Sequence, residues 1–260
     1  MGRIIAIANQ KGGVGKTTTS INLSASLAAK GKKVLVIDTD PQGNTTSGFG
    51  IEKNELEDTI YELILGECSI RDCIISNVIK NVSVVPSNVN LAAAEIELIG
   101  VDKKEFILKN EVDYVKDDYD FIIIDCPPTL TIYTDSALMA SDYYLIPNRI
   151  DRYSIVGIDS LQKAVTNLIR EERIKLRCLG LVYTMVNTNM SVKQQKIKDS
   201  FESKKTVNDI DIFDTHSTIV NDIQVGASGS LPTKYKRARE DMEAISVELL
   251  RRIKLIEQES

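Results

Sequence analysis

A glycine-rich loop near the N-terminus constrains this chain more than any other feature. Residues 10–18 read Q-K-G-G-V-G-K-T-T, close to the pattern G-x-x-x-x-G-K-[ST] of phosphate-binding loops. In such loops the glycines let backbone N–H groups approach phosphate oxygens, and the lysine reaches the β and γ phosphates. The chain departs from the pattern at Gln10, where glycine is usual, and it carries an extra lysine, Lys11, ahead of Lys16. The loop therefore predicts a nucleotide site with a second cation beside it.

Three motifs resemble those of the deviant Walker ATPases, the ParA/MinD family, whose members partition plasmids and chromosomes or position division and surface machinery. The first is K-G-G-V-G-K-T-T at residues 11–18, the second is D-T-D-P-Q-G-N-T-T at 38–46, and the third is I-I-I-D-C-P-P at 122–128. The second motif is similar to that of the ParA branch. Because the motifs stand in the family's order, each at the end of an apolar run, the chain resembles a ParA/Soj-type partition ATPase.

Apolar runs alternate with helix-length segments along the chain. We expect strands at residues 4–8, 34–37, 82–85, 121–124, 143–146 and 179–183. This alternation predicts an α/β fold with a single doubly wound, mainly parallel sheet and helices on both faces. Ligands of such folds collect at the carboxyl ends of the strands, where all three motifs lie. The first helix is expected from Ser20 to Lys30, so that its positive N-terminus faces the phosphates.

Length and composition favour one soluble domain over residues 1–260. The chain is 43% hydrophobic and 27% charged, and no apolar stretch approaches the ~18 residues of a membrane-spanning helix. Its start lacks the order of a signal peptide, and no separate DNA-binding domain is expected before the first strand. The four cysteines have no C-x-x-C spacing, which argues against a disulfide framework or a metal cluster. These features predict a cytoplasmic protein.

The loop supplies most of the expected contacts with ATP and Mg²⁺. Lys16 should reach the β and γ phosphates, and the hydroxyl of Thr17 should bind Mg²⁺. Asp125 ends an apolar run before two prolines, so its carboxylate can orient the metal through water. The predicted ATP-binding residues are Gly12, Gly13, Val14, Gly15, Lys16, Thr17 and Thr18, with Asn187 as a candidate adenine contact.

The resemblance also implies roles for the second motif. Asp40 is expected to position the attacking water, with Asp38 beside the metal, although these two roles are easily exchanged. The predicted metal-site residues are thus Thr17, Asp38, Asp40 and Asp125. D-P-Q-G is good turn chemistry as well, and Gly43 would be the hinge on which this segment rearranges.

Lys11 carries the most specific implication of the resemblance. In the family this lysine crosses a dimer interface and touches the partner's nucleotide, like an arginine finger supplied in trans. ATP would then join two subunits into a homodimer, and hydrolysis would release them because the γ-phosphate is removed. The predicted catalytic residues are Lys11, Lys16 and Asp40.

A net charge of −5 means that any DNA-binding surface must be local, since affinity for phosphates comes mostly from lysine and arginine. The densest basic cluster, Lys234, Lys236, Arg237 and Arg239, begins the last expected helix, residues 235–256. A charged helix start is also often merely solvated. Many chromosomal ParA proteins carry arginines after the strand that here ends in Thr184-Met185, and also in the following loop. This chain has Asn187, Thr188 and Asn189 at the first position, and its expected loop at residues 215–220 contains no arginine.

The last expected helix admits two interpretations. Its apolar stripe consists of Met242, Ile245, Leu249, Ile253 and Ile256. A MinD-like protein would lay such a stripe on a membrane, whereas a ParA-like protein would pack it on the core. Acidic residues on the helix, such as Glu248, would be repelled by anionic lipid, so core packing is favoured and no membrane partner is expected.

The stretch P-N-R-I-D-R-Y at residues 147–153 replaces a more usual uncharged stretch. Arg149 and Asp151 are therefore either partner contacts of a subgroup or a surface ion pair of little energetic weight.

Taken with the motifs, the resemblance implies a partition ATPase. Its ATP-bound homodimer would coat nonspecific double-stranded DNA at the nucleoid, and a ParB-like centromere-binding partner would stimulate hydrolysis and release. Nothing in the motifs supplies a strong base, so the intrinsic rate should be slow. Two alternatives stay open: a MinD-like positioning ATPase, and a small-molecule ligase or amidotransferase that uses a similar loop to phosphorylate its substrate.

Overall fold

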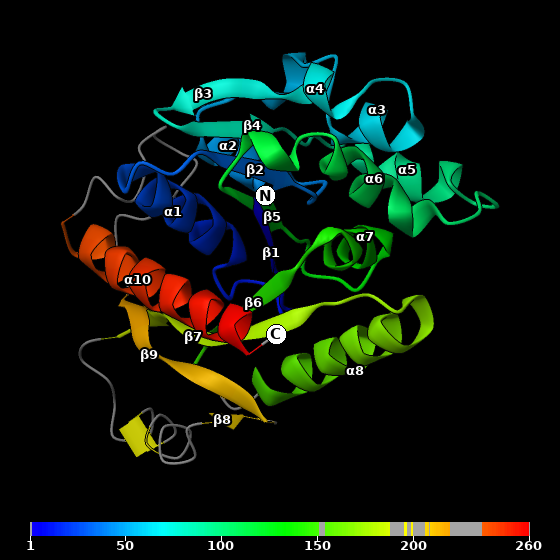
Figure 1. Ribbon diagram of the computed structural model, residues 1–260. Coiled ribbons are helices and arrows are strands. Elements are labelled where there is room, and N and C mark those ends of the chain that lie inside the picture. The colour runs from blue at the N-terminus through cyan, green and yellow to red at the C-terminus, as the bar shows by residue number, and fades with distance from the viewer. Residues whose placement is uncertain are drawn as a thin grey trace.

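The computed structural model describes residues 2–150, 154–187, 195–196, 199, 206–207, 209–218 and 236–259, which form an α/β fold around a central sheet (Figure 1). The strands are β1 (Arg3–Ile7), β2 (Val34–Asp38), β3 (Ile75–Ile79), β4 (Val82–Val85), β5 (Phe121–Asp125), β6 (Tyr143–Arg149), β7 (Arg177–Val186), β8 (Thr206–Val207) and β9 (Ile210–Thr218).

In the described part of the chain the strand order is β3-β4-β2-β5-β1-β6-β7-β9-β8. The pairs β3–β4 and β8–β9 at the two edges are antiparallel, and the pairs between them are parallel. The predicted fold class, a mainly parallel sheet with helices on both faces, is confirmed.

All six strands expected from the sequence are present, but β3, β8 and β9 were not expected. Strand β9 reads I-D-I-F-D-T-H-S-T, and its solvent-facing residues break the continuous apolar run that marks a strand buried on both faces. The expectation of a loop at 215–220 was therefore wrong for residues 215–218, which end β9.

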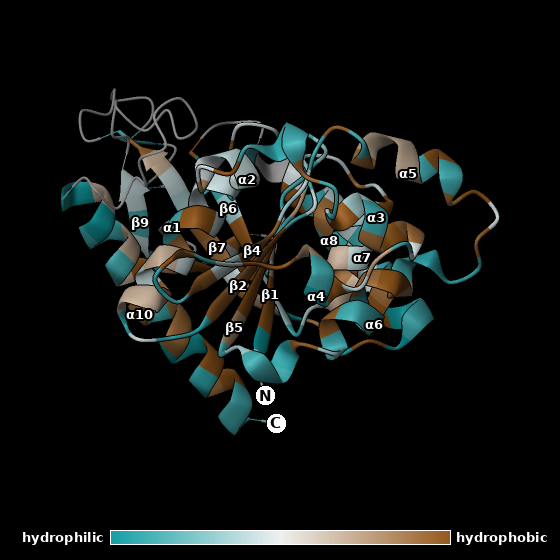
Figure 2. Ribbon diagram, turned by 90° about the horizontal axis from the view of Figure 1, so that it is seen from above, coloured by the Kyte–Doolittle hydropathy of each residue, from teal (hydrophilic) through white to brown (hydrophobic). Residues whose placement is uncertain are grey.

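Helices cover both faces of the sheet. They are α1 (Lys16–Ala29), α2 (Asn44–Gly48), α3 (Ile60–Leu65), α4 (Ile70–Cys73), α5 (Leu91–Glu97), α6 (Ile107–Asp113), α7 (Ile132–Ala140), α8 (Ser154–Glu172) and α10 (Lys236–Gln258), with short 3₁₀ turns at Lys53–Glu55, Lys104–Phe106 and Lys116–Asp118. Figure 2 looks along the sheet and shows α1 and α10 on one side, with α4, α6 and α7 on the other.

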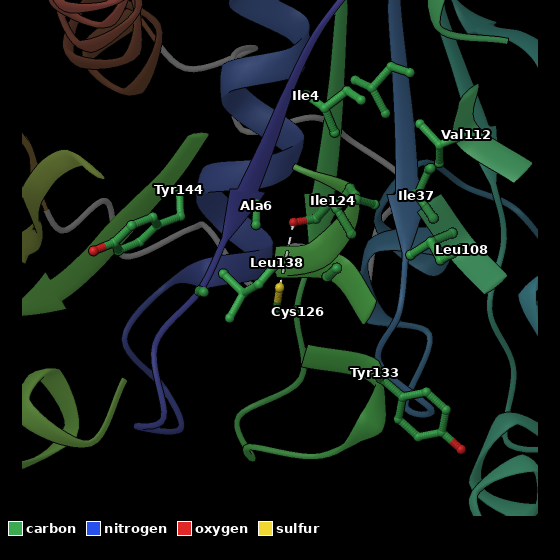
Figure 3. Packing of buried hydrophobic residues seen from close by; sticks show 14 of the residues in the cluster. Ile4, Ala6, Ile37, Leu108, Val112, Ile124, Cys126, Tyr133, Leu138 and Tyr144 are labelled. Atoms are coloured by element: carbon green, nitrogen blue, oxygen red, sulfur yellow. Dashed lines mark hydrogen bonds between the residues drawn. The ribbon is translucent and has the colours of Figure 1, made fainter. Parts of the chain in front are cut away.

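Alternating side chains of the strands feed two separate cores. In β1, Ile5 and Ile7 pack with α1 and α10, whereas Ile4 and Ala6 pack with the helices on the opposite face. Side chains in a strand point to opposite faces in turn, so each central strand must be apolar throughout. Figure 3 shows part of the second core, where Ile4 and Ala6 lie near Ile124 of β5. This double burial explains why the central strands were recognisable in the sequence.

Helix α10 packs its apolar stripe on the core. Met242, Ile245, Leu249 and Ile253 are buried between α1 and β9, and the hydroxyls of Ser26 and Ser246 lie 3.0 Å apart across the α1–α10 contact. Of the two interpretations of this helix, core packing is confirmed. Among the described residues, no helix has the length and apolar character needed to span a membrane.

A buried carboxylate fastens α10 to β9. Glu248 accepts the backbone N–H groups of Asp214 and Thr215, both at 3.0 Å, and the guanidinium of Arg252 at 2.8 Å. Arg252 in turn donates to the carbonyls of Leu179 and Ile212. The carboxylate of Glu248 therefore satisfies backbone N–H groups of an outer strand and holds α10 against it.

Candidate functional site

The three sequence motifs meet at the carboxyl edge of the sheet. Strand β5 lies between β1 and β2, and in the register of these strands Asp125 stands beside both Ile7 and Asp38. The glycine-rich loop follows β1, the second motif follows β2, and Asp125 ends β5. The topology thus assembles residues from three distant parts of the sequence into one site, as expected for a doubly wound sheet.

The glycine-rich loop wraps over the start of α1. Gly13 and Gly15 have φ values of 68° and 87°, in the left-handed region that glycine enters without a steric penalty. The ammonium of Lys16 is buried and donates to the carbonyl of Lys11 at 3.2 Å. Burial lowers the pKa of Lys16, and the nearby carboxylate of Asp125 opposes that shift. The loop therefore holds a desolvated cation at the N-terminus of a helix, which is an arrangement suited to phosphate.

Asp125 is the centre of a cluster of hydroxyl groups. Its carboxylate accepts hydrogen bonds from Thr17 and Ser20 of α1, both at 2.9 Å, and from Thr45 of α2 at 2.6 Å. Burial raises the pKa of Asp125, although these hydroxyls and Lys16 favour the ionised form. The roles of Ser20 and Thr45 were not expected from the sequence.

Asp38 is fully buried beside Asp125. Its carboxylate accepts the backbone N–H and the hydroxyl of Thr46, at 2.9 Å and 2.7 Å, and the backbone N–H of Asp40 at 3.1 Å. Burial, together with the charge of Asp125, raises the pKa of Asp38 to about 7. Two buried carboxylates thus lie on neighbouring strands with the buried ammonium of Lys16 near Asp125.

The segment from Asp40 to Thr46 is hydrogen-bonded to Ser87, which lies two residues after β4. The hydroxyl of Ser87 donates to the carbonyl of Asp40 at 2.8 Å, and the backbone N–H of Ser87 donates to the hydroxyl of Thr46 at 2.9 Å. Gly43 begins α2 with φ 57°, and a Cβ at this position would lie 2.5 Å from the carbonyl oxygen of Ser87. Glycine is therefore required here by both the backbone conformation and the close approach. We call residues 38–46 the switch segment.

Three polar side chains that were not predicted as site residues hold the backbone of the glycine-rich loop. Asn9 lies two residues after β1, Asn148 is the last but one residue of β6, and Thr184 lies two residues before the end of β7; all three are buried. Asn9 accepts the backbone N–H of Lys11 at 3.0 Å and donates to the side chain of Asn148 at 3.4 Å. The hydroxyl of Thr184 lies 2.6 Å from the carbonyl oxygen of Val14. We call these three residues the polar ladder; they bond the loop at the backbone of Lys11 and of Val14. Their sequence signal is a polar residue near the end of an apolar strand.

Comparison with known proteins identifies the family. Residues 2–178 match the model of a family described as an AAA domain. The sporulation initiation inhibitor protein Soj of Bacillus subtilis (strain 168) is 44% identical over 212 residues, which cover 80% of this chain and 84% of that protein. This chain belongs to the ParA/Soj family. The resemblance drawn from the three motifs is thereby confirmed.

Two of the solved structures that resemble this ParA/Soj-family chain carry nucleotides. A cobyrinic acid a,c-diamide synthase from Mycobacterium smegmatis with bound ADP and magnesium has a TM-score of 0.85 at 26% identity and covers 98% of this chain and 96% of its own. A putative plasmid partition protein from Borrelia burgdorferi B31 bound to AMPPNP has a TM-score of 0.79 at 27% identity, with 96% and 98% covered. The fold therefore serves both partition proteins and a metabolic enzyme.

The remaining predicted residues of this ParA/Soj-family chain lie around the same edge of the sheet. Asn187 is exposed directly after β7, and Arg149 is exposed at the end of β6. Lys236, Arg237 and Arg239 are exposed on the first turns of α10, whose next turn is tied by Asp241 to Thr218 at the end of β9. Lys234 and Asp151 lie outside the described residues.

Proposed function

We propose that this chain is an ATP-dependent DNA partition protein of the ParA type. Its ATP-bound homodimer would bind nonspecific double-stranded DNA, and a ParB-like centromere-binding partner would stimulate hydrolysis and release. The proposal rests on hydrogen bonds that connect the switch segment with the acidic residues beside the glycine-rich loop. Thr45 donates to the same carboxylate as Thr17, and Thr46 donates to Asp38. A ligand that drew Thr17 away from Asp125 would therefore disturb contacts of the switch segment.

The polar groups at the carboxyl edge fit ATP and Mg²⁺. Asp38 and Asp125 are two buried carboxylates with Lys16 nearby, and a divalent cation would offset their mutual repulsion. Mg²⁺ prefers oxygen ligands and usually combines one or two carboxylates with waters and substrate phosphates. Thr17 and Asp125 would hold Mg²⁺, with Asp38 and Asp40 close by, and the metal would supply positive charge that offsets the charge of the phosphates.

The loop residues would bind the triphosphate. Backbone N–H groups of residues 12–18 face the phosphates at the start of α1, and the ammonium of Lys16 exchanges the carbonyl of Lys11 for phosphate oxygens. Asp40 would position the attacking water from the switch segment. Since none of these groups is a strong base, hydrolysis depends on positioning and should be slow until a partner completes the site.

Lys11 would act across the dimer. Its backbone N–H and carbonyl are occupied within the subunit by Asn9 and Lys16, so the loop fixes where its side chain starts. A lysine that reaches the neighbour's nucleotide would make ATP part of the interface, and loss of the γ-phosphate would release both subunits.

The DNA surface would be local and basic. Lys236, Arg237 and Arg239 are exposed on α10, and the contact of Asp241 with Thr218 places this end of the helix at the carboxyl edge of the sheet. A basic patch on the nucleotide side would let dimerisation double the number of phosphate contacts, which helps an acidic chain to bind DNA.

A metabolic ligase is the second candidate, and the likeness to the synthase from Mycobacterium smegmatis favours it. Such an enzyme would hydrolyse ATP only with its small substrate and would need neither DNA nor Lys11. A membrane-positioning ATPase is less supported because the apolar stripe of α10 is buried.

A mobility-shift assay with unrelated duplex DNA tests the proposal. We expect retardation with ATP but not with ADP or without nucleotide, and the affinity should fall steeply with salt. The hydrolysis-deficient variant Asp40→Ala should bind ATP, form a stable dimer on sizing chromatography and prolong the retardation. A wild-type chain that fails to bind DNA with ATP, or binds independently of salt, contradicts the partition function.

A further inference from the structure

Residues 89–101, which we call the α5 segment, leave several large aliphatic side chains in solvent. Val89, Ile96 and Ile99 are 65%, 72% and 74% exposed, and Val101 is also exposed. Isolated apolar residues on a surface need no explanation, but a contiguous group marks a binding surface. Elsewhere in the described chain the exposed large hydrophobic residues are scattered over α6, α8 and α10 and their flanks. The α5 segment therefore stands out as a candidate interface.

Helix α5 is apolar on two opposite faces. Leu91, Ala94 and Leu98 are buried in the core. Exposed apolar residues recur every three or four positions on the other face: Val89, then Ala92 and Ala93, then Ile96 and Ile99. Hydrogen bonds from Ala92 N to Val89 O and from Ile99 N to Ile96 O extend the helical turns beyond α5 at both ends. Since an apolar helix face is normally packed against another element, the exposed outer face of α5 is a candidate for covering by another molecule.

The borders of the outer face are acidic. With 3.6 residues per turn, Glu95 and Glu97 fall on the two flanks between the buried and the exposed apolar faces. Both carboxylates belong to exposed residues, and Glu97 accepts the phenol hydroxyl of Tyr61 at 3.0 Å. Residues 89–101 contain no lysine or arginine. The surface that complements this face is thus an apolar stripe flanked by basic side chains.

The charge pattern disfavours a second copy of this chain as the cover. In a twofold contact through this face the same residues would meet each other. Glu95 and Glu97 of one subunit would then lie against the carboxylates of its partner, which costs free energy because like charges are brought together.

The α5 segment is connected to the switch segment at its start. Ser87, two residues before Val89, donates to the carbonyl of Asp40 and to the hydroxyl of Thr46. The carbonyl of Leu91 accepts the phenol hydroxyl of Tyr133 on α7, the helix that follows Asp125 and is seen from close by in Figure 3. A protein bound to the α5 segment can therefore alter both motifs that carry the acidic residues of the site.

We propose that the α5 segment binds a basic amphipathic segment of the partner that stimulates ATP hydrolysis. The contact would act on hydrolysis through Ser87, by fixing where the switch segment holds Asp40. This inference rests on the proposed function for the identity of the partner, but the chemistry of the surface can be tested without it.

The first experiment measures stimulation of ATP hydrolysis by the ParB-like partner. We expect the double variant Ile96→Ser/Ile99→Ser to need at least tenfold more partner for half-maximal stimulation, with a basal rate like that of the wild type. Glu95→Lys should show a smaller loss in the same direction. Val247→Ser, which removes an aliphatic side chain that is 55% exposed on α10, and Glu171→Lys on α8 are the controls. Stimulation that is equal in the double variant and in the controls overturns the inference.

The second experiment uses synthetic probes and does not depend on partition. Two helical peptides of about 18 residues, one built from leucine and lysine and the other from leucine and glutamate, are compared by fluorescence anisotropy. The leucine–lysine peptide should bind the wild type and Val247→Ser at least tenfold more tightly than Ile96→Ser/Ile99→Ser, and the leucine–glutamate peptide should bind none of them. Equal binding of the basic peptide to all three proteins would mean that this face is not its site.

These measurements separate the inference from the proposed function. If the wild type neither binds DNA with ATP nor responds to a ParB-like partner, partition fails, while the peptide result still decides the chemistry of the face. If Ile96→Ser/Ile99→Ser instead abolishes the ATP-dependent dimer of Asp40→Ala on sizing chromatography, the face is an interface between copies of this chain and our assignment of its occupant is wrong.

Discussion

The side-chain oxygen of Asn9 accepts the backbone N–H of Lys11 at 3.0 Å, so a residue just after β1 sets the backbone position of the extra lysine. The amide of Asn9 also donates to the carbonyl of Pro147 at 2.8 Å, which anchors it to strand β6. Buried polar groups linked in this way hold a single geometry because each would lose a hydrogen bond by moving. The phosphate loop is therefore organised before any ligand arrives.

The first prediction concerns Thr184, the member of the polar ladder that contacts Val14. Thr184→Val keeps the shape of the side chain but leaves the carbonyl of Val14 without its 2.6 Å partner. Because a lost hydrogen bond in a buried network costs about 1 kcal/mol, we expect nucleotide affinity to fall about three- to tenfold, as measured by titration with a fluorescent ATP analogue. Thr166→Val, which removes an exposed hydroxyl from α8, is the control. An unchanged affinity in Thr184→Val would show that the ladder does not position the loop.

The hinge glycine of the switch segment gives the second prediction. Gly43 and Gly31 both have positive φ, 57° and 80°, but an added Cβ would lie 2.5 Å from the carbonyl of Ser87 at Gly43 and would meet nothing within 4 Å at Gly31. Gly31→Ala should therefore lower the free energy of unfolding by only about 1 kcal/mol, the cost of holding alanine in the left-handed conformation. Its rate of ATP hydrolysis should not change. Gly43→Ala should destabilise the protein further and reduce hydrolysis at least tenfold, because Ser87 must move from Asp40 and Thr46.

Urea unfolding of the two glycine variants and their ATPase rates test this comparison. Equal losses of stability and activity in the two proteins would mean that the close approach to Ser87 has no consequence for the switch segment.

The carboxylate that joins α10 to β9 gives the third prediction, on pH. Burial alone would raise the pKa of Glu248, but hydrogen bonds from Thr215, Arg252 and Asp214 outweigh it, so the pKa lies below the usual value of 4.5. A depressed carboxyl pKa stabilises the fold above the unfolded pKa, and this stabilisation is lost as the pH falls through the lower folded value. Glu248→Gln should thus be less stable than the wild type at pH 7, by about 2–3 kcal/mol since Arg252 loses its buried partner.

The difference between the two proteins should shrink below pH 4.5, where the wild-type carboxyl begins to be protonated. Urea titrations at several pH values measure it, with Glu243→Gln on the exposed side of α10 as the control. A difference that stays constant from pH 7 to pH 3.5 contradicts the assignment of the charge.

The sequence predicted the centre of this fold better than its edges. Strands such as β5, F-I-I-I-D, are buried on both faces, and that requirement leaves a continuous apolar run in the sequence. Strand β9 contributes Ile210 and Ile212 to one core and Phe213 to the other, and its polar groups are held by Glu248 and Asp241 from α10. These two carboxylates lie 23 to 34 positions further along the chain, so a local pattern could not reveal the contacts.

A similar limit applies to the site. Lys16, Thr17 and Asp125 were recognisable because each has a fixed place in a contiguous motif. Asn148 and Thr184 contribute one polar group each from strands whose ends meet only in the folded sheet. Asn148 and Thr184 come together only because β6 pairs with β7. Since they do not form a contiguous sequence motif, they could not be predicted without knowledge of that pairing.

The fourth prediction concerns the extra lysine itself. Two of the intrasubunit contacts of Lys11 use its backbone: the N–H donates to Asn9, and the carbonyl accepts from Lys16. Alanine keeps both backbone groups, so Lys11→Ala should preserve these two contacts, and the monomer's nucleotide affinity should change by no more than about twofold. If the side chain acts in trans, the same change should weaken the ATP-dependent dimer at least tenfold, because each subunit loses a charged contact with its neighbour's nucleotide.

Light scattering after sizing chromatography measures the dimer most clearly in the Asp40→Ala background, where ATP is not consumed. Lys30→Ala removes a partly exposed lysine from the far end of α1 and is the control. A double variant Lys11→Ala/Asp40→Ala that dimerises as tightly as Asp40→Ala would exclude a role in trans. Lys11 would then act only within its own subunit, where its backbone carbonyl accepts the ammonium of Lys16.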